Sequence, residues 1–123
     1  MNGKKDKLIR LAVLNTEISK VLNENLESLI VYRSKGLISH LIKRKHYVAL
    51  KYINMLPDII ERPDYAGYYK GNVELVKCYS DIIFVSIRID SNKKYYYVTT
   101  VFEVKKSKID SYVKSGRINK VTY

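Results

Sequence analysis

The sequence predicts an α+β fold, in which N-terminal helices pack on one face of a roughly four-stranded antiparallel sheet. Two observations favour this fold class. Apolar residues in the first half recur at three- and four-residue spacings, which is the period of a buried helix face. Much of the second half alternates apolar and polar residues between short turns, as antiparallel strands do. We therefore expect a single domain over residues 1–123, of which residues 1–6 form a charged tail.

Three helical segments are expected in the first half of the chain. The first spans about residues 7–22, and the second follows Ser34, whose hydroxyl can cap it. The third is interrupted by Pro57, which cannot donate to a continuous helix and so begins a new turn. Residues 62–64, Arg-Pro-Asp, end the helical half. The apolar stripes of these helices are Leu11, Leu14, Ile18, Val21 and Leu22; then Leu37, Ile38, Leu41 and Ile42; then Val48, Tyr52, Leu56, Ile59 and Ile60.

Strands are expected over residues 26–32, 72–79, 81–90 and 95–104. A glycine-containing loop before the second of these is expected to hold Tyr65, Tyr68 and Tyr69. The third strand is expected to bury one face and to become more polar along the other. A final short helix stops at Gly116. That helix is expected to turn inward Ile109, Tyr112 and Val113.

The charge of the chain indicates a polyanionic partner. The sequence holds 23 basic and 12 acidic residues, a net charge of +11. Nucleic acid is the commonest partner for such an excess, and a solvated, solubilising surface is the alternative. No acid lies between Glu27 and Asp58, and residues 105–123 hold a second basic block with one acid, Asp110.

Other composition features exclude several classes of protein. Cys78 is the only cysteine, so a disulfide within the chain is excluded. No apolar run is long enough for a signal peptide or a membrane span, and we expect a cytoplasmic protein without a membrane partner. The sequence has no phosphate-binding glycine loop and no zinc-type cluster, and its carboxylates are scattered. We therefore expect neither a metal ion nor a cofactor.

Both histidines, His40 and His46, flank the triplet Lys43-Arg44-Lys45. Imidazole serves as acid or base near neutral pH. With hydroxyls and cations it suits RNA cleavage by attack of a 2′-hydroxyl, in which one group takes a proton and another protonates the departing oxygen. On one continuous helix the two histidines lie ~240° apart. Either the helix ends near Lys45 or only one histidine is catalytic, and His46, at the helix exit, is preferred.

Residues 34–67, SKGLISHLIKRKHYVALKYINMLPDIIERPDYAG, with the later VTTVFE and SGRI, resemble the phage-associated branch of the barnase/EndoU/colicin/RelE-like (BECR) nucleases. That branch has a Ser-x-Gly-x-x-x-His segment, a basic histidine pair, a helix, a Pro-Asp turn and a strand carrying Thr-x-aromatic. The resemblance implies a metal-independent ribonuclease that leaves a 2′,3′-cyclic phosphate, of a kind found in toxins, phages and mobile elements. It matches His40 and His46 to the histidines of the family, Thr100 to its threonine and Asp64 to its turn.

The strand threonine stays open between two positions. Strict alternation places Thr100 on the face of Val98 and Phe102, and it places Thr99 on the other face with Tyr97. A register bulge would reverse this arrangement. The resemblance favours Thr100 and the alternation favours Thr99, so both are candidates, with ordinary strand packing as the alternative role.

Cations and an aromatic ring are expected to bind the RNA. Arg88 either clamps a phosphate or pairs with Glu103 across the strands. Tyr97 either stacks an unpaired base, for ~1–3 kcal/mol, or packs at the sheet edge. The expected RNA-binding cations are Arg88, Lys43, Arg44, Lys45, Lys105, Lys106 and Arg117.

The leading hypothesis is a metal-independent endoribonuclease that acts on tRNA or mRNA, as a toxin or an effector of a phage or mobile element. For a toxin, we expect an acidic antitoxin or immunity protein as partner. The first alternative is a non-catalytic RNA-binding module on the same fold, which binds RNA without cutting it. The second is a DNA-binding regulator that uses the helical half, although no paired helices with a recognition pattern stand out.

Overall fold

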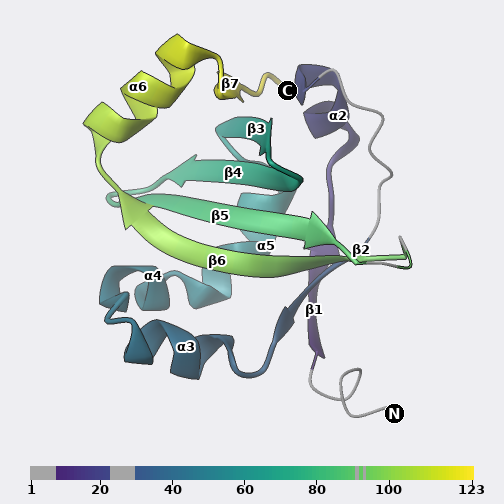
Figure 1. Cartoon of the computed structure of the whole chain (residues 1–123), viewed down its shortest axis with the longest axis vertical. Coiled ribbons are helices and arrows are strands. Elements are labelled where there is room, and N and C mark those ends of the chain that lie inside the picture. The colour runs from purple at the N-terminus through teal and green to yellow at the C-terminus, as the bar shows by residue number, and fades with distance from the viewer. Residues whose placement is uncertain (1–7, 23–29, 91, 93) are drawn as a thin grey trace.

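A seven-stranded mixed sheet forms the centre of the protein (Figure 1). The computed structural model describes residues 8–22, 30–90, 92 and 94–123. Across the sheet the strands follow the order β1-β2-β6-β5-β4-β3-β7. They are β1 Leu8–Val13, β2 Ile30–Ser34, β3 Tyr65–Tyr69, β4 Asn72–Cys78, β5 Ile82–Ile89, β6 Tyr96–Val104 and β7 Ile118–Lys120.

The antiparallel meander β4-β5-β6 confirms the strands expected over residues 72–79, 81–90 and 95–104. The expected sheet of roughly four antiparallel strands is wrong, because β1, β3 and β7 also join it and β2 runs parallel to β6. β2 pairs with β6 only at Tyr96 and Tyr97. Beyond this point the described residues place no strand along that edge of β6, and α4 contacts β6 instead.

The N-terminal segment is a strand followed by a short helix, so the helix expected over residues 7–22 is wrong. Leu8–Val13 pairs antiparallel with β2, and helix α2 covers only Thr16–Leu22. The apolar spacing that suggested one helix runs across both elements, since Leu14 between them and Ile18 in α2 are both fully buried. Burial against the sheet overrides the local periodicity here.

Three smaller expectations also change. Of the strand expected over residues 26–32, residues 26–29 lie outside the described part of the chain, and the remainder belongs to β2. Ser34 ends β2 and does not cap a helix; Gly36 precedes α3, without a side-chain capping hydrogen bond. The glycine-containing loop expected to hold three tyrosines is strand β3, because it pairs with β4 on one side and with β7 on the other.

The remaining helices are α3 Leu37–Lys43, α4 Tyr47–Lys51, the 3-10 turn η1 Ile53–Met55, α5 Leu56–Glu61 and α6 Lys106–Ser115. Pro57 lies in the first turn of α5, and Gly116 ends α6 in the left-handed conformation with φ 82°, as predicted. Three apolar residues expected to be buried are not: Ile38 and Ile42 of α3 and Val113 of α6 are 36%, 48% and 41% exposed. No helix in the described ranges has the length and apolarity to cross a membrane.

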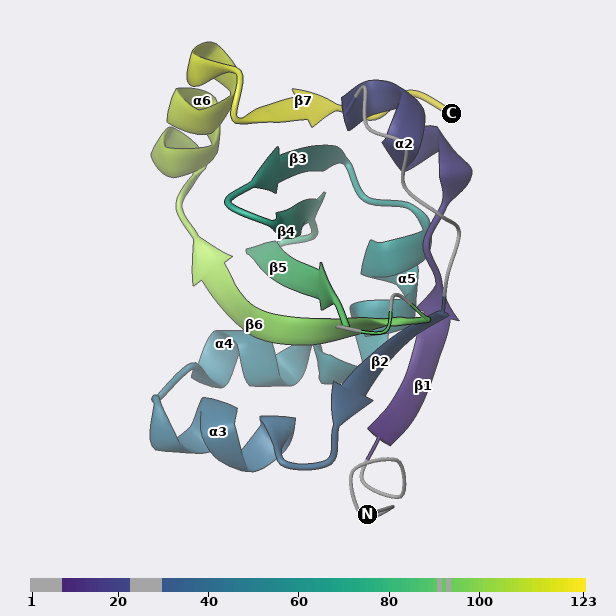
Figure 2. The same cartoon turned by 45° about the vertical axis from the view of Figure 1, so that its right-hand side comes forward.

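Helices cover both faces of the sheet, and not one face as expected. The larger core packs Val85 and Ile87 of β5 against α3, α4 and α5. A second core lies on the opposite face, where Phe84 packs with Ile109 of α6 and with Ile118. The face of β5 that was expected to become polar is therefore buried as far as Ser86. Figure 2 shows α6 and the α3–α4 pair on opposite sides of β6.

Candidate active site

A row of paired residues, three of them polar, crosses four adjacent strands on the sheet face that carries α6. The register pairs Gly67 of β3 with Glu74 of β4. Glu74 in turn pairs with Ser86 of β5, and Ser86 pairs with Thr100 of β6. Directly paired residues of antiparallel strands point to the same face. Glu74 and Ser86 are each only 4% exposed, and Thr100 is half-buried. We call Gly67, Glu74, Ser86 and Thr100 the polar row.

A bulge in β6 decides which threonine belongs to the polar row. Ser86 pairs with Thr100, but the next residue of β5, Ile87, pairs with Val98. Thr99 is therefore the extra residue of the bulge, and its Oγ1 donates a hydrogen bond to the Ser86 carbonyl at 3.0 Å. The bulge reverses the strict alternation, so that Thr100 joins the polar row and Thr99 lies exposed beside it.

Arg117, between α6 and β7, is fixed to the polar row. Its Nε and Nη2 donate to the two Glu74 carboxylate oxygens at 2.8 and 2.7 Å. The rings of Tyr69 and Tyr112 lie 3.9 and 4.2 Å from its guanidinium carbon. Gly67 permits this approach, because a Cβ there would overlap the Arg117 carbonyl oxygen. Hydrogen bonding to Glu74 raises the pKa of Arg117, so the row keeps a permanent cation.

Arg88 lies further along the same face, next to the β3–β4 hairpin. Its Nε donates to Asn72 Oδ1 at 3.2 Å and its Nη2 donates to the Lys70 carbonyl at 3.0 Å. The alternative of an ion pair with Glu103 is wrong, because the register pairs Arg88 with Tyr97. Arg88 is exposed and Tyr97 is half-buried, so both reach the surface beside the polar row.

The chain breaks its helix between α3 and α4, and this break brings His46 to the sheet. α3 ends at Lys43, and Lys45 has a positive φ of 59°, which a continuing helix does not allow. His46 then precedes α4, half-buried, with its ring 6.4 Å from the ring of Phe102 in β6. Phe102 follows Thr100 by two residues and shares its face. The alternative in which the helix ends near Lys45 is confirmed.

His40 does not join this group. It is exposed on α3, and none of the described residues forms a hydrogen bond, ion pair or ring contact with its side chain. Of the cations expected to bind RNA, Lys106 pairs with Asp110 at 3.3 Å on the surface of α6. Four others are exposed, whereas Arg117 is half-buried; the exposed ones are Lys43, Arg44, Lys45 and Lys105.

Two hollows open beside these groups. One of about 360 Å³ lies over the polar row and is bordered by Thr99, Arg117 and Phe102. The other, of about 270 Å³, is lined by His46 and Phe102 among others. Phe102 lines both hollows, so a group bound over the polar row lies one side chain from His46. A carboxylate, hydroxyls, a fixed cation and an imidazole are together the groups used for proton transfer and for stabilising negative charge.

Sequence reasoning missed both buried polar side chains of the polar row, Glu74 and Ser86. Glu74 is the one acid in the apolar run NVELVKC, and a buried acid in a strand needs a partner. Ser86 is the one small polar residue inside DIIFVSIRID. These local signals mark unusual burial, but only the register shows that both residues adjoin Thr100.

Within the described ranges, no three His, Cys, Asp or Glu side chains are grouped as metal ligands. A family model described as phage-Barnase-EndoU-ColicinE5/D-RelE like nuclease 3 matches residues 10–111. This match includes His46, Glu74 and Thr100, whereas Arg117 follows it. No curated protein and no solved structure is significantly similar to the chain.

Proposed function

The chain belongs to the phage-Barnase-EndoU-ColicinE5/D-RelE like nuclease 3 family, and we propose that it is an endoribonuclease that cuts RNA without a metal ion. Family membership makes it a nuclease. RNA as the substrate, attack by a 2′-hydroxyl and a 2′,3′-cyclic phosphate product are our proposal. The observation that supports it best is the polar row, where the Glu74 carboxylate, the Thr100 hydroxyl and the Arg117 cation adjoin on one sheet face.

The proposed reaction needs two proton transfers and one stabilised anion. A base removes the 2′-hydroxyl proton while that oxygen forms a bond to phosphorus. The bond from phosphorus to the 5′-oxygen then breaks, and an acid gives that oxygen a proton. Donors fixed around the phosphorus hold the negative charge in between. Every proton is accounted for by two side chains, so water enters only when the cyclic phosphate is later hydrolysed.

We assign these roles by position. We assign the two proton transfers to His46, beside Phe102, and to Glu74, whose side chain lines the hollow over the polar row. Arg117 supplies the fixed positive charge, since Glu74 and two tyrosine rings hold its guanidinium in place. The Thr100 hydroxyl donates a hydrogen bond to a phosphate oxygen. His40 has no role in this scheme, because it points to solvent from α3.

Exposed cations flank the polar row on both sides. Arg88 and Lys70 lie toward the β3–β4 hairpin, and Lys45 and Lys105 lie toward the other end of β6. Cations at both ends suit the backbone of a single RNA strand that crosses the sheet face, with Tyr97 available for stacking. Binding should therefore weaken steeply as salt rises.

We further propose that the enzyme acts in the cytoplasm on tRNA or mRNA, as a toxin or an effector of a phage or mobile element. The net charge of +11 supports a protein inhibitor with an acidic surface that covers the same face. Expression in a host cell should then stop growth. Co-expression of the acidic inhibitor should restore it.

The decisive experiment incubates the purified protein in EDTA with a single-stranded RNA and with DNA of the same sequence. We expect RNA fragments ending in 2′,3′-cyclic phosphate and intact DNA, because DNA lacks the attacking hydroxyl. Intact RNA that is nevertheless bound would show the non-catalytic RNA-binding module. Cleaved DNA, or cleavage that EDTA abolishes, would contradict the proposed reaction.

A matched pair of variants tests the bulge assignment in the same assay. Thr100→Val keeps a β-branched side chain but removes the hydroxyl over the polar row, so cleavage should fall about tenfold or more. Thr99→Val makes the same chemical change at the neighbouring exposed position and should have the smaller effect. The opposite ranking would show that Thr99 contacts the phosphate.

A further inference from the structure

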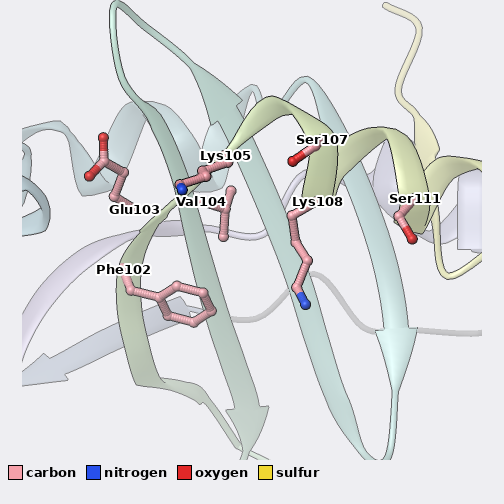
Figure 3. Close-up of a pocket in the computed structure, with 7 residues that line it drawn as sticks. All are labelled: Phe102, Glu103, Val104, Lys105, Ser107, Lys108 and Ser111. Carbon is pink, nitrogen blue, oxygen red and sulfur yellow. The ribbon is translucent and has the colours of Figure 1, made fainter.

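A third hollow, of about 450 Å³, lies where β6 runs into α6 (Figure 3). It is lined by Phe102, Glu103, Val104, Lys105, Ser107, Lys108 and Ser111. Glu103 pairs with Ile83, so it belongs to the opposite face of β6 from Phe102, and Figure 3 shows its carboxylate directed away from Lys108. The volume falls in the usual range of ligand pockets, roughly 300–1,000 Å³.

The chemistry of this hollow differs from that of the polar row. It has no imidazole, and the one carboxylate at its border points away. It offers an aromatic ring, an apolar side chain, two hydroxyls and two ammonium groups. Proteins that recognise unpaired RNA bases stack them on aromatic rings and hydrogen-bond to their edges. The hollow therefore has the parts of a base-binding pocket and lacks those of a second reaction centre.

Phe102 connects this hollow to the place of the proposed reaction. Its side chain also lines the hollow over the polar row and the hollow around His46. Stacking on Phe84, with 4.9 Å between ring centroids, holds the ring in position. A phosphate bound between His46 and Thr100 thus places its attached nucleoside against Phe102.

Building on the ribonuclease function proposed above, we propose that the hollow between β6 and α6 binds the base of a nucleotide next to the cleaved phosphate. We assign it a preference for guanine and uracil, the bases with a keto oxygen, O6 or O4, where adenine and cytosine carry an amino group. Phe102 supplies the stacking surface, and Lys108 supplies the discrimination. This is a specificity subsite, separate from the groups that transfer protons.

Lys108 discriminates because an ammonium group only donates hydrogen bonds. Guanine O6 and uracil O4 accept from it, whereas adenine and cytosine carry donating amino groups at the equivalent place. The hydroxyls of Ser107 and Ser111 donate or accept, so they bind either kind of base. Lys108 forms no ion pair with any described carboxylate, unlike Lys106, which is paired with Asp110. Its ammonium nitrogen lies 5.5 Å from the centre of the Tyr112 ring, and this cation–π contact occupies none of its hydrogen-bond donors. Its ammonium is therefore available to a ligand.

The test maps the cuts that the protein makes in a random-sequence single-stranded RNA pool. In the wild type, guanine and uracil should be enriched about tenfold over adenine and cytosine at one of the two positions beside the cut, the size of one hydrogen bond to a charged group. Lys108→Met keeps the stem but removes the donor, and should bring the base frequencies close to parity while cleavage continues. Lys108→Glu, whose carboxylate accepts from amino groups, should move the enrichment toward adenine and cytosine.

Lys114→Met is the matched control, because it removes the same charge from the exposed last turn of α6, outside the hollow. It should keep the wild-type enrichment. Equal base frequencies beside the wild-type cuts, or unchanged enrichment in Lys108→Met, would overturn the subsite while leaving the ribonuclease function intact. Absence of any cleavage by the wild type would remove the ribonuclease function and the subsite with it.

Discussion

Glu74 and Arg117 form one ion pair, but we expect the loss of Arg117 to cost more folding stability than the loss of Glu74. Arg117→Met keeps a long apolar stem and removes the guanidinium, and Glu74→Gln removes only the charge. Among the described residues, Arg117 is the one hydrogen-bond donor to the Glu74 carboxylate. The Glu74 side chain is 5% exposed and that of Arg117 is 25% exposed. Water therefore reaches Arg117 more easily than Glu74 when the pair is broken.

The magnitudes follow from this difference in exposure. Removing one partner of a buried ion pair costs about 3–5 kcal/mol, because a charge stays behind without a partner. Arg117→Met leaves Glu74 in that state, so we expect a loss near the lower end, about 3 kcal/mol. Glu74→Gln leaves a cation that water partly solvates and an amide oxygen that still accepts, so we expect about 1 kcal/mol. A domain of this kind has only ~5–15 kcal/mol of stability in total.

Urea denaturation of both single variants and of the double variant measures these losses, with the midpoint compared at a constant slope. The double variant should lose less than the sum of the two single losses, because coupled partners are not additive. If Arg117→Met loses no more stability than Glu74→Gln, the reasoning from burial is refuted. Strict additivity would show that the two side chains do not act as a pair.

Three other measurements probe the histidines, a tyrosine and the cysteine. His46→Ala should lower the rate of RNA cleavage about 100-fold or more, the usual size of a general acid–base contribution. His40→Ala should cleave at close to the wild-type rate. Equal losses in the two variants would contradict the proposed roles. Tyr123 is 52% exposed, but its hydroxyl donates to the Pro63 carbonyl, and desolvation there raises its pKa to about 12. Between pH 10.0 and about 12 the folded protein therefore holds a proton that the unfolded chain has lost. Stability measured by urea midpoints should therefore fall as pH rises through that window, and fall less in Tyr123→Phe. Cys78 is exposed, yet partial desolvation of its thiol, and next the Asp64 carboxylate, raise the pKa of that thiol, so iodoacetamide at neutral pH should modify it more slowly than in the urea-unfolded protein.

The parts of the fold that could be predicted are those with a local signal. The meander β4-β5-β6 has alternating residues between short turns, and α3 and α5 have apolar residues at helical spacing, of which Leu37 and Leu41 of α3 are buried and Ile38 and Ile42 are not. Pro57 and Gly116 mark helix boundaries through backbone chemistry that does not depend on the rest of the chain. These predictions succeed because neighbours in the sequence are enough to decide them.

The strands β1, β3 and β7 could not be predicted, because distant partners create them. β3 is short and rich in tyrosine and glycine, and it becomes a strand by pairing with β4 and with β7 from the end of the chain. β1 pairs with β2, which follows α2 in the sequence. Leu14 and Ile18 have the spacing of one helical stripe, but Leu14 precedes α2 and both are buried. The parallel pairing of β2 with β6 joins Val31 to Tyr96, which no local pattern signals.

The position of His46 beside the sheet could be predicted from local backbone geometry. Two histidines six residues apart diverge on one helix, and His46 is preferred because it stands at the helix exit. The positive φ of Lys45 shows that the helix does end before His46. Arg117 was expected only as one cation of a basic block. Its bidentate bond to Glu74 makes it distinct, and that bond depends on the close approach that Gly67 allows.

The bulge in β6 links the packing of the core to the composition of the site. Val98 and Val101 both pack into the larger core, although they are three residues apart and strict alternation would send them to opposite faces. One extra residue between them resolves the conflict, and Thr99 is that residue. The same insertion turns Thr100 to the face of Ser86. Packing Val98 and Val101 on the core face of β6 thus places the Thr100 hydroxyl on the opposite face. The polar row therefore depends on the apolar packing behind it.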